Sequence, residues 1–142
     1  MVLKYQREID LFIGQGYELP QLYGIHSKDA FRYVFANNNQ HNHIPPHKLH
    51  PNRLAQQIKN ERVDLTGFAL SNLETEDKAI AFYRYLHKIC KNVKKQIGDS
   101  LSYGILYNSD GLITSTDSKG HFDLFESDTC NLSLSFNIVR SL

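Results

Sequence analysis

The chain has few of the residues that mark specialised classes of protein. Its 142 residues include two cysteines, four prolines, one methionine and no tryptophan. Cys90 and Cys130 are too few for a disulfide framework or a zinc knuckle. The scarcity of cysteine therefore favours a reduced, cytoplasmic protein.

Long apolar runs and an excess of one charge are also missing. No stretch approaches the ~20 apolar residues of a membrane-spanning helix. Glu8 and Asp10 stand where a secretory signal would be apolar, so we expect no signal peptide and no membrane partner. With 16 Lys and Arg against 15 Asp and Glu, the net charge of +1 excludes long-range attraction of the whole chain to nucleic acid. Only a local basic patch could bind nucleic acid.

Hydrophobic residues make up 41% of the chain and charged residues 22%, which is typical of a globular protein and excludes wholesale disorder. The length fits one domain spanning residues 1–142. Helical periodicity predicts helices over residues 2–13, 52–62 and 75–98, of which the last is the longest. Alternation predicts strands over residues 31–35, 67–70, 101–107, 112–116, 121–126 and 132–138, with turns at 108–111 and 117–120. The expected fold is therefore α+β: a mostly antiparallel sheet with one long helix packed on a face and an N-terminal helix.

Residues 37–51 are rich in Asn, His and Pro and predict a long surface loop. Four histidines lie in it: His41, His43, His47 and His50. Histidines at such close spacing can bind a metal when one strand presents the rings on one face. The prolines and the absence of a nearby carboxylate favour a solvated polar loop, so we expect no metal.

A group of cations lies in the second half of the predicted long helix: Arg84, Lys88, Lys91, Lys94 and Lys95. Together with neighbouring tyrosines, these side chains suit a nucleic-acid backbone. The alternative is a solvated helix face whose cations lie where the helix dipole favours them. Nucleic-acid binding through this helix therefore stays an alternative function.

The cysteines and His121 offer little nucleophilic chemistry. Cys90 is expected on the apolar face of the long helix, and Asp128 is expected to raise the thiol pKa of Cys130. His121 could act as an acid–base group beside a site, or could be the polar residue that follows a hairpin turn. The position directly after the turn favours the hairpin role.

Arg32, Ser71 and Glu126 form the constellation that points to chemistry, because each belongs to a different predicted strand. A guanidinium neutralises a phosphate, and a serine hydroxyl holds a ribose or braces its strand. A carboxylate stabilises the positive charge that develops on a sugar during glycosidic cleavage. This order predicts a cleft for a charged nucleotide. The alternative is that Arg32 and Glu126 are rim charges paired across the sheet.

The same order resembles that of ADP-ribosyltransferase-like folds, through Arg32 in FRYVF, Ser71 in GFALS and Glu126 in HFDLFE. The chain lacks the Ser-Thr-Ser run and the Glu-x-Glu pair of many members of those families. The resemblance implies an NAD-consuming transferase or glycohydrolase, such as a toxin or effector, with these three residues as catalytic. It also implies that Arg32 binds NAD and that an aromatic ring stacks on nicotinamide, for which Phe68 and Phe82 are candidates.

A non-enzymatic protein-binding or adaptor module is the main alternative. The strands are rich in tyrosine and phenylalanine, and the edge of a predicted strand over residues 132–139 could pair with a strand of a partner protein. The sequence thus leaves three hypotheses: an NAD-consuming enzyme, a protein-binding module and a nucleic-acid-binding protein.

Overall fold

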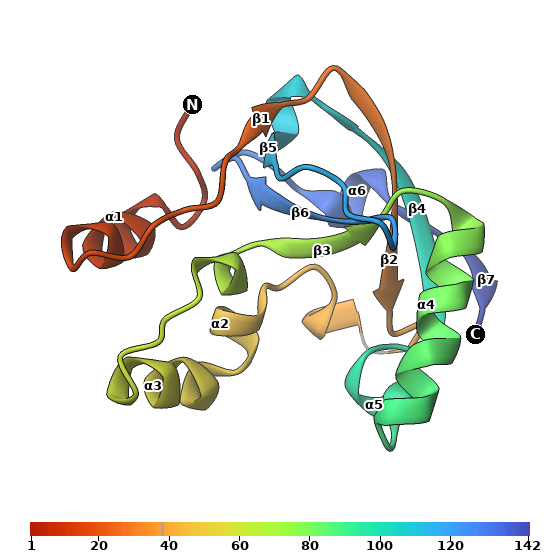
Figure 1. Cartoon of the computed structure of the whole chain (residues 1–142). Helices are drawn as coiled ribbons and strands as arrows, with labels where there is room; N and C mark the ends of the chain where they lie inside the picture. Colours follow the sequence, from red (N-terminus) through yellow and green to blue (C-terminus); the bar gives the residue numbers. More distant parts are fainter. Residues whose placement is uncertain (38) are drawn as a thin grey trace.

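Seven strands form one sheet in the computed structural model, which describes residues 1–37 and 39–142 (Figure 1). Their order across the sheet is β1-β5-β6-β3-β2-β4-β7, and all neighbours pair antiparallel. The strands are β1 (Tyr23–Gly24), β2 (Ser27–Val34), β3 (Leu70–Leu73), β4 (Ser100–Tyr107), β5 (Gly111–Ile113), β6 (His121–Glu126) and β7 (Asn137–Ser141). The predicted α+β class with a mostly antiparallel sheet is confirmed.

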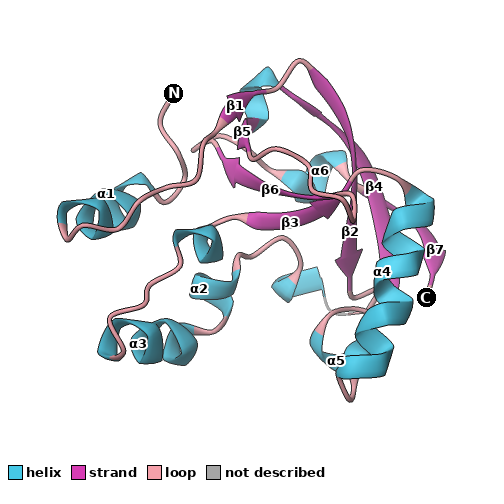
Figure 2. Cartoon of the chain, in the orientation of Figure 1, coloured by secondary structure: helices cyan, strands magenta, loops and turns pink. Residues whose placement is uncertain are grey.

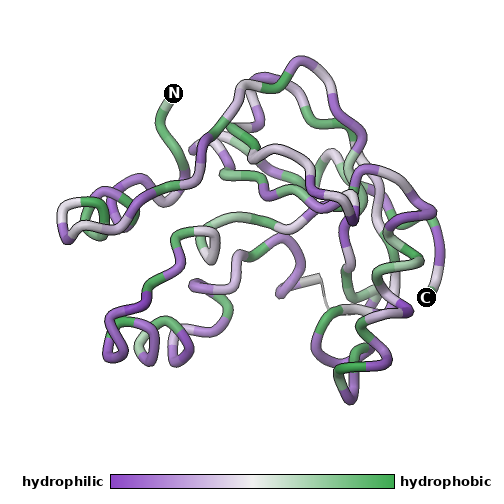
Figure 3. The backbone as a smooth tube through the Cα atoms, in the orientation of Figure 1, coloured by the Kyte–Doolittle hydropathy of each residue, from purple (hydrophilic) through white to green (hydrophobic). Residues whose placement is uncertain are grey.

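Helices flank this sheet (Figure 2). The α-helices are α1 (Gln6–Gly14), α2 (Pro46–Leu49), α3 (Pro51–Lys59), α4 (Glu76–Ile89), α5 (Val93–Gln96) and α6 (Leu132–Ser135). Short 3-10 helices are η1 (Asn39–His41), η2 (Leu65–Phe68) and η3 (Asn108–Asp110). α3 has no buried residue, and Figure 3 shows much of its backbone in the hydrophilic colours, so this helix lies at the periphery.

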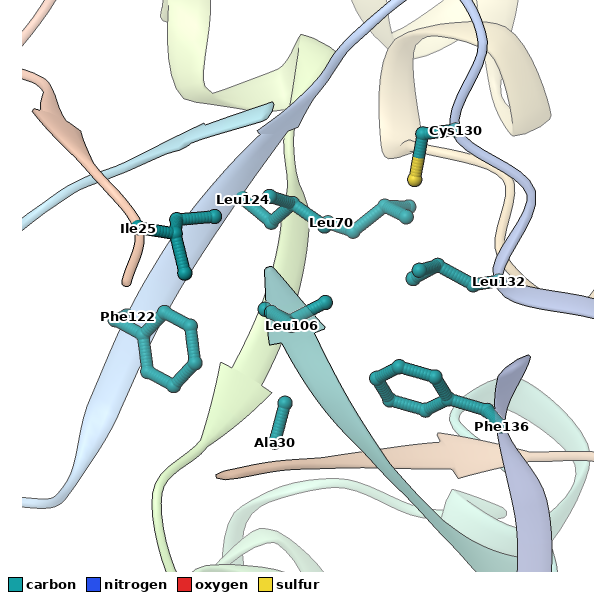
Figure 4. Packing of buried hydrophobic residues seen from close by; sticks show 9 residues of the cluster. All are labelled: Ile25, Ala30, Leu70, Leu106, Phe122, Leu124, Cys130, Leu132 and Phe136. Atoms are coloured by element: carbon teal, nitrogen blue, oxygen red, sulfur yellow. The ribbon is translucent and has the colours of Figure 1, made fainter. Parts of the chain in front are cut away.

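One face of the sheet carries the largest apolar core (Figure 4). Because side chains alternate along a strand, Ala30, Leu70, Phe122 and Leu124 come to the same face of three neighbouring strands. The segment from Cys130 to Phe136 covers them; the cluster comprises Ile25, Ala30, Leu70, Leu106, Phe122, Leu124, Cys130, Leu132 and Phe136. Burying a leucine or phenylalanine side chain contributes ~1.5–3 kcal/mol to stability.

The opposite face is covered at its two ends by different helices (Figure 1). α4 packs over Leu73 and Leu101, and the hydroxyl of Tyr33 donates to the carbonyl of Ala79 at 2.6 Å. α1 packs over Phe125 and Phe68. Short elements, among them α2 and η2, lie between these two helices (Figure 1).

The first residues of the chain fasten onto the end of β6. Leu3 forms an isolated antiparallel bridge with Ser127, and α1 begins only at Gln6. The ammonium of Lys4 lies 2.7 Å from the carboxylate of Glu126 and donates to the carbonyl of Cys130 at 2.7 Å. The predicted helix over residues 2–13 therefore starts several residues later than expected, because the preceding residues pair with a strand.

The prediction of one long helix over residues 75–98 is wrong. Thr75 caps α4 as expected, through its side-chain oxygen and the amide of Lys78, but α4 ends at Ile89. Cys90 has extended backbone angles, and Asn92 has a φ of 62°, in the left-handed region that asparagine tolerates. Cys90 is consequently half-buried at the helix end, where its thiol donates to Gln96, and does not lie in the core.

Two predicted strands are wrong in part. Residues 65–68 form η2, whose start is capped by Asp64 through the amide of Thr66, and the strand begins only at Leu70. Residues 132–135 form the single turn α6, which buries Leu132 and leaves Leu134 exposed, and β7 begins at Asn137. In both segments an alternating apolar pattern is compatible with one helical turn, and pairing with distant residues decides between them.

Replacement of Gly104 by alanine is expected to destabilise the protein. A Cβ at this position in β4 would clash with the ring of Phe136, so Gly104→Ala must displace that ring. We expect a loss of about 1–3 kcal/mol in the free energy of unfolding, measured by urea denaturation. Gly14→Ala is the control, because nothing lies within 4 Å of its Cβ, and it should leave stability unchanged or slightly raised. Equal midpoints for the two variants would contradict the tight packing of β4 against Phe136.

Candidate functional site

A pocket opens at a gap between two central strands. β2 and β3 pair only at Phe31 and Leu73, and beyond this point the two strands diverge (Figure 1). The Arg32 guanidinium bridges the gap, because its Nη1 donates to the carbonyl of Ser71. A pocket of about 600 Å³, lined by Arg32 and Ser71 among others, opens beside this bridge.

Arg32 is a buried charge without a directly bonded counter-ion. Its exposed fraction is 8%, and its Nε donates to Nδ1 of His43 at 2.9 Å. Among the residues that the structure describes, no carboxylate lies within ion-pair distance of Arg32 and no acceptor bonds its Nη2. Burial lowers the pKa of Arg32 to about 10, against the opposing effect of Glu126 and Asp123. The guanidinium therefore stays charged at neutral pH.

His43 serves Arg32 as a neutral acceptor. Burial, and secondarily the charge of Arg32, lower the pKa of His43 to about 3. A protonated ring could not accept the Arg32 hydrogen bond, so the contact requires the neutral imidazole with its lone pair on Nδ1. The ring also contacts Phe136 edge-on, at 5.6 Å between centroids.

The prediction that residues 37–51 form a solvated loop is wrong for this part of the chain, with position 38 outside the described residues. His47 lies in α2 and is 4% exposed. Its Nε2 is 2.6 Å from the carbonyl of Asp64, and its ring packs edge-on against Phe68. Because His43 and His47 bond to different partners, the loop histidines do not converge on one point.

The large pocket is lined by cations and by no acid. Its charged or ionisable side chains are Arg32, His41, His50, Arg53 and Lys95, and no Asp or Glu is among its described lining residues. Burial, and secondarily Arg53, lower the pKa of His50, which disfavours its charged form. The apolar lining includes Phe35, Ile44, Leu49, Leu70 and Ile97. The pocket thus combines three permanent positive charges with an apolar wall.

A smaller pocket of about 330 Å³ adjoins the first, and both are lined by Pro46, Arg53 and Ser71. In the smaller pocket the hydroxyl oxygen of Ser71 lies 3.1 Å from Nε2 of His121. Because Ser71 lines both pockets, this residue lies where they meet.

The structure brings together two of the three residues that the sequence singled out. Arg32 and Ser71 are bonded to each other at the large pocket. Glu126 lines neither pocket: it is 4% exposed and pairs with Lys4, and its Oε1 has no partner among the described residues. Glu126 does act on Arg32 through its charge, from the same face of the sheet. Its carboxylate is nevertheless separated from the ligand-sized space that Arg32 and Ser71 share.

The aromatic and cysteine candidates lie outside the pockets as well. Phe68 is 2% exposed and is packed among Tyr5, Phe12 and His47, so its ring has no free face for nicotinamide. Phe82 packs with the α4 core, against Leu73. Cys130 is buried, and burial, with Glu126 and Asp110, raises the pKa of its thiol to about 12, which excludes a thiolate nucleophile at neutral pH.

The basic residues predicted on one helix are divided between two. Arg84 and Lys88 lie on α4, whereas Lys94 and Lys95 lie on α5, with Lys91 in the turn between them. All five side chains are exposed. Lys95 also lines the large pocket, so part of this basic surface belongs to the pocket.

Sequence reasoning missed His43 as the hydrogen-bond partner of Arg32, and Arg53 and His50 as lining residues of its pocket. Arg53 is in the first turn of α3, and His50 immediately precedes that helix. The four histidines of residues 41–50 indicated a functional segment, but their spacing suggested only metal ligands and not contacts with an arginine. Their proximity to β2 depends on how the chain folds back, which no local pattern reveals.

No family model, no curated protein and no solved structure matches this chain. Across residues 1–37 and 39–142, no helix has the length and apolar character required to cross a membrane. Within the same residues, no three His, Cys, Asp or Glu side chains gather closely enough to hold a metal ion.

Because His43 is neutral in the folded protein, the free energy of unfolding is expected to decrease as the pH falls below 6.5. Its folded-state pKa of about 3 is below its ordinary value of 6.5, so between these values the unfolded chain binds a proton that the folded chain does not. The stabilisation is fully present above pH 6.5 and is lost as the pH falls, by up to about 1.4 kcal/mol per pH unit. His43→Asn keeps an acceptor for Arg32 and should reduce this slope, measured by urea unfolding at about pH 7, 6 and 5.

The control for this measurement is His26→Asn, because His26 is exposed and lies outside the pocket. It should retain the wild-type slope. A His43→Asn variant whose stability falls with pH as steeply as that of the wild type would show that His43 is not the neutral partner of Arg32.

Proposed function

We propose that this protein binds a small phosphate ester, of the nucleotide class, in the pocket between β2 and β3. The observation that carries the proposal is Arg32: a charged side chain that is more than nine-tenths buried, lines the pocket and has an unbonded Nη2 among the described residues. A buried charge is costly unless it is paired. A bound anion would supply the missing counter-charge.

Phosphate suits the geometry of these cations. Arg32 and Arg53 present planar guanidinium groups, which bond two oxygens of a phosphate at once, and Lys95 adds a third positive charge at the rim. Arg53 and Lys95 are exposed and form no ion pair with a described residue, so their charges are available. No carboxylate of the described lining competes with the ligand.

The apolar wall supports a ligand that is more than a phosphate ion. Ile44, Leu49 and Ile97 lie in the same pocket as the cations, and a volume of about 600 Å³ is that of a small-molecule site. A nucleotide combines an anionic end with a flat, weakly polar base, which matches this division. ADP-ribose and NAD are the ligands we would test first, in keeping with the resemblance described above.

Glycosidic cleavage is not part of the proposal. The ADP-ribosyltransferase-like hypothesis assigns that chemistry to a carboxylate beside the sugar, and Glu126 is paired with Lys4 outside the pocket. What supports the shared ligand class is the meeting of Arg32 with Ser71.

Neutralising the two exposed cations of the pocket is expected to weaken ligand binding. The double variant Arg53→Gln/Lys95→Gln should bind ADP-ribose at least about tenfold more weakly than the wild type, because each charge-assisted hydrogen bond contributes roughly 1.5–3 kcal/mol. Isothermal titration calorimetry gives the dissociation constants. Both side chains are exposed, so the fold should be retained.

The matched control is Lys59→Gln/Lys91→Gln, which removes the same charge from exposed positions outside the pocket lining. Its affinity should equal that of the wild type. If both double variants weaken ADP-ribose binding equally, the ligand is attracted by the overall charge of the protein and not by the pocket. If the wild type binds neither ADP-ribose nor NAD nor inorganic pyrophosphate, the proposed function is wrong.

A further inference from the structure

We propose that Ser71 and His121 are a nucleophile and its general base, which act on the phosphate ester held by the Arg32 pocket. This inference rests on the proposed function for its substrate class, but the reactivity of the pair can be tested without any ligand. It assigns catalysis to two residues of neighbouring strands that face the junction of the two pockets.

The two side chains meet because of the pairing of β3 with β6. Ser71 lies opposite Asp123, and His121 lies opposite Leu73, so the serine and histidine are diagonal neighbours on one face. The Oγ of Ser71 is 3.1 Å from Nε2 of His121, within hydrogen-bond distance. Ser71 is exposed and lines both pockets, whereas the histidine side chain is 28% exposed. The hydroxyl is thus both accessible to a ligand and bonded to a base.

The turn before β6 favours the histidine tautomer that a base requires. The carboxylate of Asp117 accepts hydrogen bonds from the amides of Lys119 and His121, at 2.9 Å each, and these bonds lower the pKa of Asp117. Its other oxygen lies 3.9 Å from Nδ1 of His121. The charge of Asp117 favours a proton on Nδ1, whereas the charge of Asp123, which lies 3.5 Å from Nε2, favours a proton on Nε2. The proposal requires the tautomer with its proton on Nδ1, which leaves Nε2 free to accept the proton of Ser71.

Asp123 stabilises the positively charged ring of His121 after proton transfer. Its Oδ1 lies 3.5 Å from Nε2 of His121, farther than the serine oxygen. Once His121 becomes positively charged, the carboxylates of Asp117 and Asp123 both lie within 4 Å of the ring and stabilise it. The arrangement is that of a serine nucleophile, a histidine base and supporting acids.

Arg32 connects this pair to the anion site. Its Nη1 donates to the carbonyl of Ser71, and both residues line the large pocket. Arg53 lines both pockets. The proposal places a phosphate held by these guanidiniums at the serine hydroxyl, with its developing negative charge opposite the cations.

The chemical step balances with water as the co-reactant. The Oγ of Ser71 bonds to phosphorus as Nε2 of His121 takes its proton, and the bond from phosphorus to the ester oxygen breaks. The imidazolium returns the proton to the leaving alcohol. Water, deprotonated by His121, then attacks the phosphoserine, and the serine oxygen leaves with the proton.

A fluorophosphonate probe tests the pair directly, because the attack forms a bond from Oγ to phosphorus and expels fluoride. We expect the wild type to carry a single adduct, located on Ser71 by peptide mass spectrometry. Ser71→Ala should abolish labelling, and His121→Gln should slow it at least tenfold. Ser118→Ala and His26→Gln change exposed residues elsewhere and should label at the wild-type rate. An unlabelled wild type, or labelling at the same rate in His121→Gln, overturns the proposal.

The tautomer of His121 gives a second readout that does not depend on variants. The ring ¹⁵N chemical shifts should show Nδ1 protonated and Nε2 unprotonated in the wild type at neutral pH, and a proton fixed on Nε2 would overturn the proposal. ADP-ribose separates the two inferences. Protection of Ser71 from the probe supports both, whereas labelling that ADP-ribose binding leaves unchanged overturns the link between the pair and the pocket. Failure of ADP-ribose to bind counts against the proposed function alone.

Discussion

The hydrogen bonds of the Arg32 guanidinium organise the centre of this protein. β2 and β3 share one paired position, and the arginine replaces the missing ladder with a bond to the carbonyl of Ser71. Through Nε it also holds His43, which brings the histidine-rich segment onto the sheet. The side chain of Arg32 therefore joins β2 to β3 and to the segment that contains His43. The pocket opens where this bridge spans the two separated strands.

This arrangement constrains the protonation of its surroundings. Burial, and secondarily the positive charge of Arg32, lower the pKa of His43, so this ring stays neutral well below its ordinary pKa. The nearest acids act from farther away, since neither Glu126 nor Asp123 forms an ion pair with the guanidinium. Among the described residues, the charged side chains that line the pocket are all cations, so a ligand anion meets no carboxylate there.

The sequence predicted what depends on neighbours along the chain. The strand over residues 121–126 was found with its boundaries, because alternation follows a clear turn, and the strand over residues 101–107 was found nearly so. The break after Ile89 was missed, since Cys90 and Asn92 do not interrupt an apolar period. Arg32 and Ser71 were expected to lie together, and they are hydrogen-bonded to each other. Glu126 was expected to join them, but its carboxylate pairs with Lys4, which is distant in the sequence. Such a long-range partner leaves no trace in local pattern.

The pairing of Lys4 with Glu126 has a consequence for the order in which the protein is made. The two residues are separated by 122 positions, and Cys130, the other acceptor of the lysine, comes later still. Translation therefore delivers the ammonium long before either partner has left the ribosome. The contact of Lys4 with these partners closes only after residue 130 has emerged, so the N-terminal segment stays without them while the strands in between are synthesised.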